Sequence, residues 1–246
     1  MTAILVGCDP EVFVKKGGVF QSAFNLIIGD KKAPQKVRNG AVQVDGMALE
    51  FNIDPARTED EFCYYVQDVL NTMTKMVPEF EVVAVPVAHF SEEYMKLQPA
   101  AALELGCDPD FNAWADGAVN TKPDGNRPMR TAAGHIHIGW TKDEEIGDKL
   151  HLERCHMLVK QLDFYLGLAS LAYDTDVERR GMYGCAGCYR PKSYGVEYRT
   201  LSNAWLKSEK LMRWAYRNTI AAVESVMAGN CLADKYGDIQ AIINKS

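Results

Sequence analysis

His135 and His137 stand two residues apart in a stretch that reads Arg-Thr-Ala-Ala-Gly-His-Ile-His-Ile-Gly, residues 130–139. We expect this stretch to be a β-strand. Alternate side chains of a strand point to opposite faces, so both imidazoles would share one face. Histidine is a frequent metal ligand and a frequent general acid or base. The pair therefore indicates a functional site, although two half-exposed strand histidines would give the same pattern.

Three further segments place polar side chains at the same spacing of two. These pairs are Asp9 with Glu11, Glu50 with Asn52, and Glu197 with Arg199. If the four strands form one sheet with their polar faces together, the carboxylates converge and raise each other's pKa by like-charge repulsion. A divalent cation would remove that repulsion, and magnesium or manganese accepts oxygen ligands with an occasional histidine. The joint pattern predicts a metal site, with four separate solvated strand faces as the alternative.

Basic side chains occur in and around these strands. The set comprises Arg130, Arg179, Arg180, Arg190, Lys192 and Arg199. Guanidinium and ammonium groups bind phosphate and carboxylate oxygens, so the set is suited to a triphosphate or to a substrate carboxylate. The chain contains no Walker sequence, kinase glycine-rich loop or GxGxxG fingerprint, which argues against the common nucleotide-binding folds.

Hydrophobic periodicity predicts the elements that must position these side chains. Period-two patterns predict strands at 3–14, 19–28, 41–53, 79–85, 130–139 and 194–201. Apolar stripes at helical spacing predict helices at 55–77, 144–173, 207–227 and 232–243. Polar segments predict loops at 29–39, 112–130 and 174–192. No linker or shift in composition divides the chain, so we expect a single domain over residues 1–246.

Two other motifs carry less weight. Cys185 and Cys188 form a CxxC, but without a second CxxC or a βαβ context a zinc or thioredoxin-like role is disfavoured. His151 and His156 lie inside a predicted helix, and we expect them to be ordinary helix histidines rather than ligands.

Composition limits the classes of protein to which the chain can belong. Its 246 residues are 47% hydrophobic and carry a net charge of −6, which argues against a general nucleic-acid binder or a protein of anionic membranes. Seven cysteines without a framework spacing favour a reducing compartment. The N-terminal residues show no signal-peptide pattern, and no apolar run approaches the length of a membrane span. We therefore expect a soluble cytoplasmic protein.

Four short motifs occur in a characteristic order along the chain. They are Gly-Cys-Asp-Pro-Glu-Val-Phe (7–13), Asp-Gly-Met-Ala-Leu-Glu-Phe-Asn (45–52), Gly-His-Ile-His-Ile-Gly (134–139) and Tyr-Gly-Val-Glu-Tyr-Arg-Thr-Leu-Ser-Asn-Ala-Trp (194–205). This ordered set resembles the phage carboxylate–amine ligase (amidoligase) type 2 family, within the glutamine synthetase and glutamate–cysteine ligase superfamily. The resemblance implies an α+β fold, in which an antiparallel sheet forms a concave active-site face and helices pack on the other face.

The resemblance also implies roles for individual residues. The implied metal ligands are Asp9, Glu11, Glu50, His135 and Glu197. The implied catalytic residues are Glu50, His135 and Arg199, of which Arg199 would steady the transferring phosphate. The residues expected to bind the nucleotide cofactor are Arg130, His137, Arg190, Lys192 and Asn203.

The implied activity is ATP-dependent ligation with two or three Mg²⁺ ions, or Mn²⁺ in their place. A substrate carboxylate attacks the γ-phosphorus to give an acyl phosphate and ADP, and an amine then displaces phosphate to form an amide or peptide-like bond. The partners would be small-molecule or peptide substrates, without general nucleic-acid or membrane binding, and a homo-oligomer is compatible with the sequence. A phage-encoded protein would act in the host cytoplasm.

The sequence leaves several points open. It does not identify the substrates, the residue that deprotonates the amine or the number of ions. One alternative function is a metal-dependent hydrolase that uses the His-x-His strand, and another is a non-catalytic ligase-fold module that binds or regulates.

Overall fold

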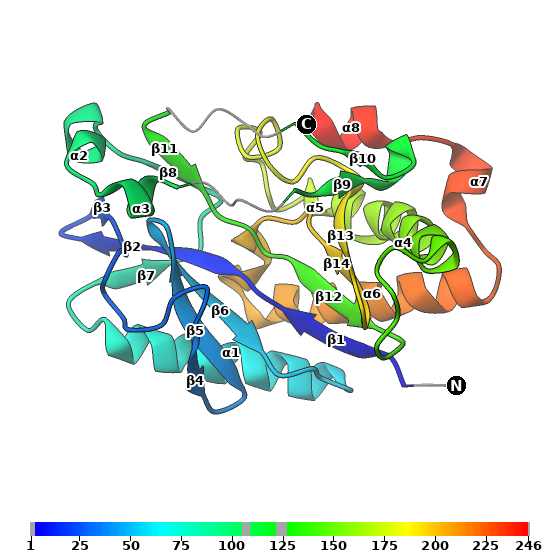
Figure 1. The fold of residues 1–246 in the computed structure, drawn as a ribbon, viewed down its shortest axis with the longest axis horizontal. Coiled ribbons are helices and arrows are strands. Elements are labelled where there is room, and N and C mark those ends of the chain that lie inside the picture. Colours follow the sequence, from blue (N-terminus) through cyan, green and yellow to red (C-terminus); the bar gives the residue numbers. More distant parts are fainter. Residues whose placement is uncertain (1–2, 105–108, 122–126, 246) are drawn as a thin grey trace.

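The first strand of the chain belongs to both large sheets. The computed structural model describes residues 3–104, 109–121 and 127–245, and the strand consists of β1 (Leu5–Cys8) and β2 (Glu11–Lys16) (Figure 1). Pro10 has no backbone N–H to offer to a ladder and separates the two halves. β1 pairs with β12 in one sheet, and β2 pairs with β6 in the other. Asp9, at the break, therefore lies where the two sheets meet.

The first sheet carries the histidine strand and the Glu197 strand. Its order is β1-β12-β14-β13-β9-β10, and every neighbouring pair is antiparallel. The bounds are β9 (Phe111–Asn112), β10 (Ala118–Val119), β12 (Ile136–Gly139), β13 (Cys188–Lys192) and β14 (Gly195–Tyr198). The register places His137 opposite Glu197, and Glu197 opposite Arg190. Directly opposed residues on neighbouring strands are close enough to interact, so this register assembles part of a site.

The second sheet carries the acids of the first hairpins. Its order is β3-β2-β6-β5-β4, and β7 also pairs with β2. The bounds are β3 (Val19–Gln21), β4 (Gln35–Val37), β5 (Gly40–Asp45), β6 (Ala48–Ile53) and β7 (Glu81–Val83). The register places Glu11 opposite Glu50, and Glu50 opposite Gln43. Leu49 and Phe51 alternate with Glu50 and are fully buried, as the amphipathic pattern predicts.

A small sheet leads into the histidine strand. β8 (Val87–His89) pairs with β11 (Met129–Thr131), and two short helices, α2 (Glu92–Lys96) and α3 (Ala100–Leu103), follow β8 in the chain. Figure 1 shows β11 running on into β12 beside β1 and β2. The carbonyl of Ala133, on this connection, accepts the N–H of Glu11 at 2.9 Å. Arg130 and His135 are thus carried by one continuous segment.

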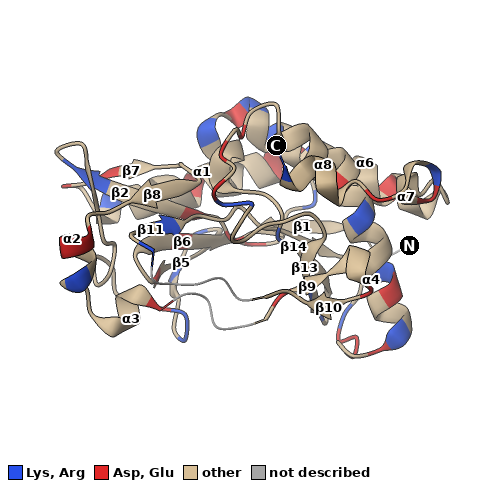
Figure 2. Ribbon diagram, turned by 90° about the horizontal axis from the view of Figure 1, so that it is seen from above, with Lys and Arg blue, Asp and Glu red and all other residues tan. Residues whose placement is uncertain are grey.

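Helices cover the sheets from one side. α1 (Glu59–Met76) packs on β5 and β6, α4 (Lys149–Leu162) packs on β13 and β14, and α6 (Glu209–Met227) contacts both helices. Figure 2 shows α1 and α6 together along one side of the strands. The Thr58 hydroxyl accepts the N–H of Glu61 at 3.2 Å and caps the start of α1. One apolar core joins residues of both sheets and of these helices, which confirms the α+β class.

Several predicted boundaries were wrong in detail. The predicted strand 19–28 ends at Gln21, because Asn25 adopts φ 63° in a turn. The predicted helix 144–173 begins only at Lys149 and passes through a π-helical turn (Asp163–Gly167) into α5 (Leu168–Ser170). The predicted helix 232–243 is two helices, α7 (Leu232–Tyr236) and α8 (Gln240–Asn244), because Gly237 has φ 74°. The predicted loops contain the short strands β4, β10 and β13.

Two 3₁₀ helices complete the described structure, at Ala113–Ala115 and Asn203–Lys207. In the part of the chain that the structure describes, no helix combines the length and the apolar character that a bilayer span requires.

Asp163, in the π-helical turn, is a fully buried carboxyl group surrounded by donors. It accepts hydrogen bonds from Trp114 Nε1 at 2.7 Å, from the Tyr198 hydroxyl at 2.8 Å and from the Thr200 hydroxyl at 3.3 Å. Burial outweighs these hydrogen bonds and raises the pKa of Asp163 from 3.8 to about 7. The folded protein therefore binds a proton here at pH values at which the unfolded chain has released it.

We expect the free energy of unfolding to fall less with rising pH in the Asp163→Asn variant than in the wild type. In the wild type this group contributes stability below the unfolded-state pKa of 3.8, and the contribution is lost as the pH rises to about 7. The slope is about 1.4 kcal/mol per pH unit, whereas asparagine does not titrate. Urea unfolding of both proteins at about pH 5 and about pH 8 measures the difference. An identical pH dependence of the two proteins would contradict this assignment.

Candidate active site

His135 and His137 contact the same carboxylate oxygen. His135 immediately precedes β12 and His137 lies within it. Asp9 Oδ1 is 3.3 Å from His135 Nδ1 and 3.0 Å from His137 Nε2. The contact is possible because the N–H of Asp9 donates to the carbonyl of His135 and aligns the two segments. The prediction that both imidazoles share one face is confirmed.

Gly134 fixes the position of the first histidine. Its N–H donates to the carbonyl of Leu201 at 3.0 Å, and its carbonyl accepts Trp205 Nε1 at 3.0 Å. A Cβ atom on residue 134 would collide with the carbonyl of Ser202 and with the Trp205 indole. Only glycine therefore lets the segment come this close to the chain after β14.

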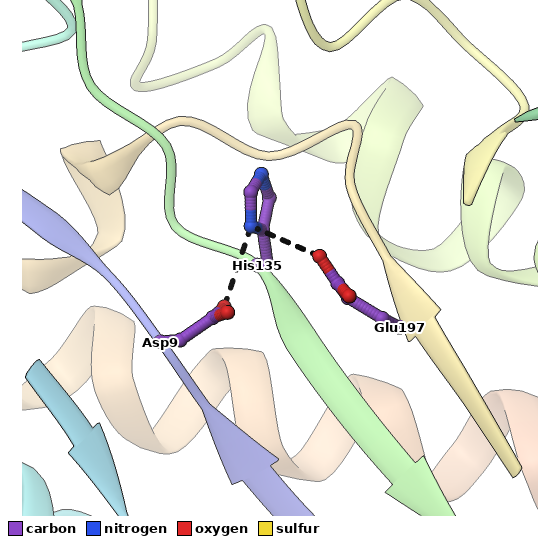
Figure 3. Close-up of side chains that lie close together, drawn as sticks. All are labelled: Asp9, His135 and Glu197. Atoms are coloured by element: carbon purple, nitrogen blue, oxygen red, sulfur yellow. Dashed lines mark ion pairs between the residues drawn. The ribbon is translucent and has the colours of Figure 1, made fainter. Parts of the chain in front are cut away.

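Glu197 attracts positive side chains from the neighbouring strands. Its side chain is 1% exposed, and Figure 3 shows it facing His135 from the side opposite Asp9. His135 Nδ1 lies 3.4 Å from Oε1, Lys192 Nζ lies 2.7 Å from Oε2, and Arg199 donates to Oε1. Arg190 Nη1 approaches Oε1 to 3.8 Å. The carboxylate is thus held at the centre of a charged group.

Burial and neighbouring charges set the protonation of this cluster. Burial and Arg199 lower the pKa of His135 to about 4, so the ring is neutral at physiological pH. Burial also opposes protonation of His137, but the nearby acids raise its pKa overall. Burial raises the pKa of Asp9, yet the two histidines hold it well below 3.8. Burial and Asp9 raise the pKa of Glu197, yet Arg199 and the histidines bring it to about 2. Both acids are therefore ionised and available as ligands.

Glu11, Asp45 and Glu50 form a second acidic cluster on the second sheet. One oxygen of each carboxylate lies within 4.8 Å of the other two. Glu11 Oε2 accepts the N–H of Ala133 at 2.8 Å, and Glu50 Oε2 accepts the amide of Gln43 at 2.9 Å. Burial and then Asp45 raise the pKa of Glu11 to about 7, and burial with the neighbouring acids raises the pKa of Glu50 well above 4.5. The like charges therefore oppose full ionisation of the cluster.

Two cavity residues were not predicted from the sequence, Asp45 and Lys31. Asp45 precedes Gly46 at the hairpin turn, a position where aspartate is common for local reasons. It also lies two residues after Gln43 on β5, so strand alternation was a usable signal that it faces Glu50. Lys31 Nζ lies 2.7 Å from Asp45 Oδ1, and nothing in its predicted loop pointed to this contact.

A cavity of about 410 Å³ connects the two clusters. Its charged and imidazole lining comprises Asp9, Glu11, Lys31, Asp45, Glu50, Glu104, Arg130, His135, Arg179, Arg190, Lys192 and Arg199. The structure therefore brings most of the predicted site residues together. Their roles as ligands, catalysts or nucleotide contacts stay predictions.

Comparison with known families agrees with this site. Residues 122–231 match the family described as Phage phiEco32-like COOH.NH2 ligase-type 2. The resemblance read from the motifs is thus confirmed over this part of the chain. No curated protein gave a significant match.

The segment that matches the family contains only part of the site. It contains the histidine strand, Glu197 and Arg199, whereas Asp9, Glu11 and Glu50 precede it. The match covers less than half of the chain. The first-strand acids and Glu50 are therefore assigned to the same site by geometry, through Asp9 and the shared cavity.

Three predicted site residues do not line the cavity: Glu197, Asn203 and His137. Asn203 is 0% exposed, and its amide donates to the carbonyls of Glu11 at 2.8 Å and Val85 at 3.0 Å. It therefore holds the backbone beside Glu11, and its position does not support the predicted nucleotide contact. His137 Nδ1 lies 2.5 Å from the Tyr194 hydroxyl and Nε2 faces Asp9, so its contacts are with protein groups at the rim.

The two helix histidines and the CxxC lie outside the site. His151 Nε2 is 2.9 Å from the carbonyl of Lys192, and His156 Nε2 is 2.5 Å from the Tyr189 hydroxyl. Both pack α4 against its surroundings, which confirms the prediction of ordinary helix histidines. Cys185 and Cys188 are free thiols whose sulfur atoms are 3.1 Å apart.

Both clusters fit a hard divalent cation. Asp9, His135 and Glu197 offer two carboxylates and one ring nitrogen within 4.8 Å of one another, and the second cluster offers three carboxylates. Among the described residues, Asp9 Oδ1 is buried and has no hydrogen-bond partner, although both histidines touch it. A bound cation would satisfy that oxygen. Oxygen-rich ligand sets of this kind suit Mg²⁺ or Mn²⁺.

Proposed function

We propose that this protein is an ATP-dependent carboxylate–amine ligase that forms an amide through an acyl phosphate. The observation that carries the proposal is the pairing of two acidic clusters across one cavity that also holds arginines and a lysine. The family match, whose description names a COOH.NH2 ligase, supports the same class of reaction.

The first half of the proposed reaction is phosphoryl transfer. A carboxylate oxygen of the acid attacks the γ-phosphorus of ATP, and ADP leaves. Magnesium bound by Asp9, His135 and Glu197 and by Glu11, Asp45 and Glu50 would offset charge on the phosphoryl oxygens. Lys192 and Arg199 both contact Glu197. Their positive charges would also stabilise the phosphoryl oxygens.

The second half is acyl transfer to the amine. The amine nitrogen attacks the acyl carbon, phosphate leaves, and the proton released by the nitrogen passes to water or to a carboxylate of the cavity. The cavity of about 410 Å³ suits small-molecule or peptide groups rather than a nucleic acid, in keeping with the net charge of −6. A homo-oligomer and a cytoplasmic location stay predictions.

Trapping the acyl phosphate tests the proposal. The protein is incubated with ATP, Mg²⁺ and pooled carboxylic acids, hydroxylamine is added as the amine, and hydroxamates are sought by mass spectrometry. We expect hydroxamate and ADP in equal amounts. Hydrolysis of amides or esters without ATP would instead establish the metal-dependent hydrolase, and nucleotide binding without either reaction would establish a binding module.

A further inference from the structure

Arg130 is a buried guanidinium that has no carboxylate partner among the described residues. The residue is 7% exposed and lines the cavity. Within the described residues its Nη atoms donate only to backbone carbonyls, of Met129 at 2.7 Å, Arg127 at 3.1 Å and Leu103 at 3.3 Å. Within the described ranges its Nε–H is buried and unpaired. A buried positive charge without a counter-ion is unfavourable, so the position calls for an anionic ligand.

Two further donors on the cavity wall are also buried without a hydrogen-bond partner among the described residues. Arg179 is 1% exposed, and its Nη atoms donate to the carbonyls of Thr200 at 2.8 Å and Arg199 at 3.3 Å. Its Nε and the Tyr183 hydroxyl are buried and, in the part of the chain that is described, without hydrogen-bond partners. Both side chains line the same cavity as Arg130. Such buried unpaired donors are rare in native proteins, and three around one cavity indicate a ligand.

The local backbone is built to hold Arg179 in place. Gly184 has φ 77°, and a Cβ atom there would collide with the Arg179 guanidinium. The chain thus wraps closely around a charged group that makes no direct ion pair with any described residue.

Arg130 has different surroundings from the cations that contact Glu197. The charges of Arg179 and Glu11, by contrast, affect each other. Lys192, Arg190 and Arg199 all approach Glu197, where they suit phosphates that bridge bound ions. In the part of the chain that the structure describes, Arg130 forms no ion pair with an acid, and its neighbour on the cavity wall, Tyr183, is a neutral phenol. An anion bound by Arg130 would therefore not compete with Glu197 for the same guanidinium group. The planar guanidinium fork matches a carboxylate better than a point charge would.

We propose that Arg130, Arg179 and Tyr183 form a subsite for a carboxylate that does not react, carried by one of the two substrates. The proposal rests on the proposed ligase function and narrows its substrates. Either the acid is a dicarboxylate, of which one end is activated, or the amine is an amino acid. Arg130 then binds substrate rather than nucleotide.

Direct binding separates the two sources. Succinate, glutarate and adipate are each titrated calorimetrically against the monocarboxylate of the same length, and glycine, β-alanine and γ-aminobutyrate against the primary amine of the same length. No ATP is present. We expect one series to bind at least about tenfold more tightly than its matched compounds, and that series identifies the substrate that carries the extra carboxylate. Equal affinity within both series would overturn the subsite.

Substitutions of Arg130 and Tyr183 test whether these residues bind the carboxylate. Arg130→Met should weaken binding of the favoured series at least about tenfold, and Tyr183→Phe, which preserves shape, should weaken it several-fold. Arg127→Met, the same change at an exposed neighbour, is the matched control and should bind as the wild type does. Wild-type binding by both test variants would overturn the proposal, as would a loss of ATP affinity alone. Carboxylate binding that depends on Arg130, in a protein that forms no hydroxamate, would refute the ligase and retain the subsite.

Discussion

Replacing Glu197 by alanine should reduce ligase turnover by at least about 100-fold. The side chain is 1% exposed and contacts His135, Lys192 and Arg199, so its loss removes a proposed metal ligand and releases the cations that it contacts. His135→Ala should have a comparable effect, because it removes the ring between the two acids. ADP release and hydroxamate formation measure the loss.

Controls separate this effect from unfolding. Glu153→Ala alters an exposed acid on α4 and should retain full turnover. Glu197→Gln keeps the volume of the side chain and removes only its charge, so it should be as inactive as Glu197→Ala while its circular dichroism spectrum stays that of the wild type. Full turnover in both Glu197→Ala and His135→Ala would contradict the assignment of these residues to the active site.

Replacing Glu50 by glutamine should stabilise the metal-free protein and impair its response to Mg²⁺. Burial and the charges of the neighbouring acids raise the pKa of Glu50 well above 4.5, so its ionised form is unfavourable in the folded state. Glutamine carries no charge and can still accept the hydrogen bond from Gln43. We expect a gain of roughly 1–3 kcal/mol in the free energy of unfolding at about pH 8.

The pH dependence of the stability gain distinguishes an electrostatic origin from better packing. A carboxyl group with a raised folded-state pKa contributes stability below its unfolded-state pKa of 4.5 and loses it as the pH rises through the folded-state pKa. The gain from Glu50→Gln should therefore be larger at about pH 8 than at about pH 5. Added Mg²⁺ should stabilise the wild type more than the variant. Glu81→Gln, at an exposed position of β7, is the control, and a gain independent of pH would contradict an electrostatic origin.

The local pattern of the sequence was sufficient for the faces of several site side chains, but not for the strand bounds: the predicted strand 130–139 is divided between β11 and β12. The alternation around His135 and His137 predicted that both imidazoles would share one face, and both contact Asp9. The alternation of Glu50 with Leu49 and Phe51 likewise predicted which face of β6 is polar. These features follow from strand geometry and from burial of apolar side chains, which depend on residues close in the chain.

Elements whose form depends on distant partners were predicted less well. β13 lies in a predicted loop. It pairs with β14 across a short turn, but its other partner is β9, which is distant in the sequence. The break of the long helix after Leu162 accompanies the burial of Asp163 against Trp114 and Tyr198, which the helical periodicity alone does not contain.

The sequence by itself determined the residue types, their spacing and the face that each presents, and hence the chemistry that the site is able to perform. Only the tertiary structure decided which of them meet: it added Asp45 to Glu11 and Glu50, placed Asn203 behind β2, and left Arg130 without a carboxylate partner in the described chain. The physical reason is that strand register and sheet order, set by packing of the whole core, fix distances between residues that no local pattern relates.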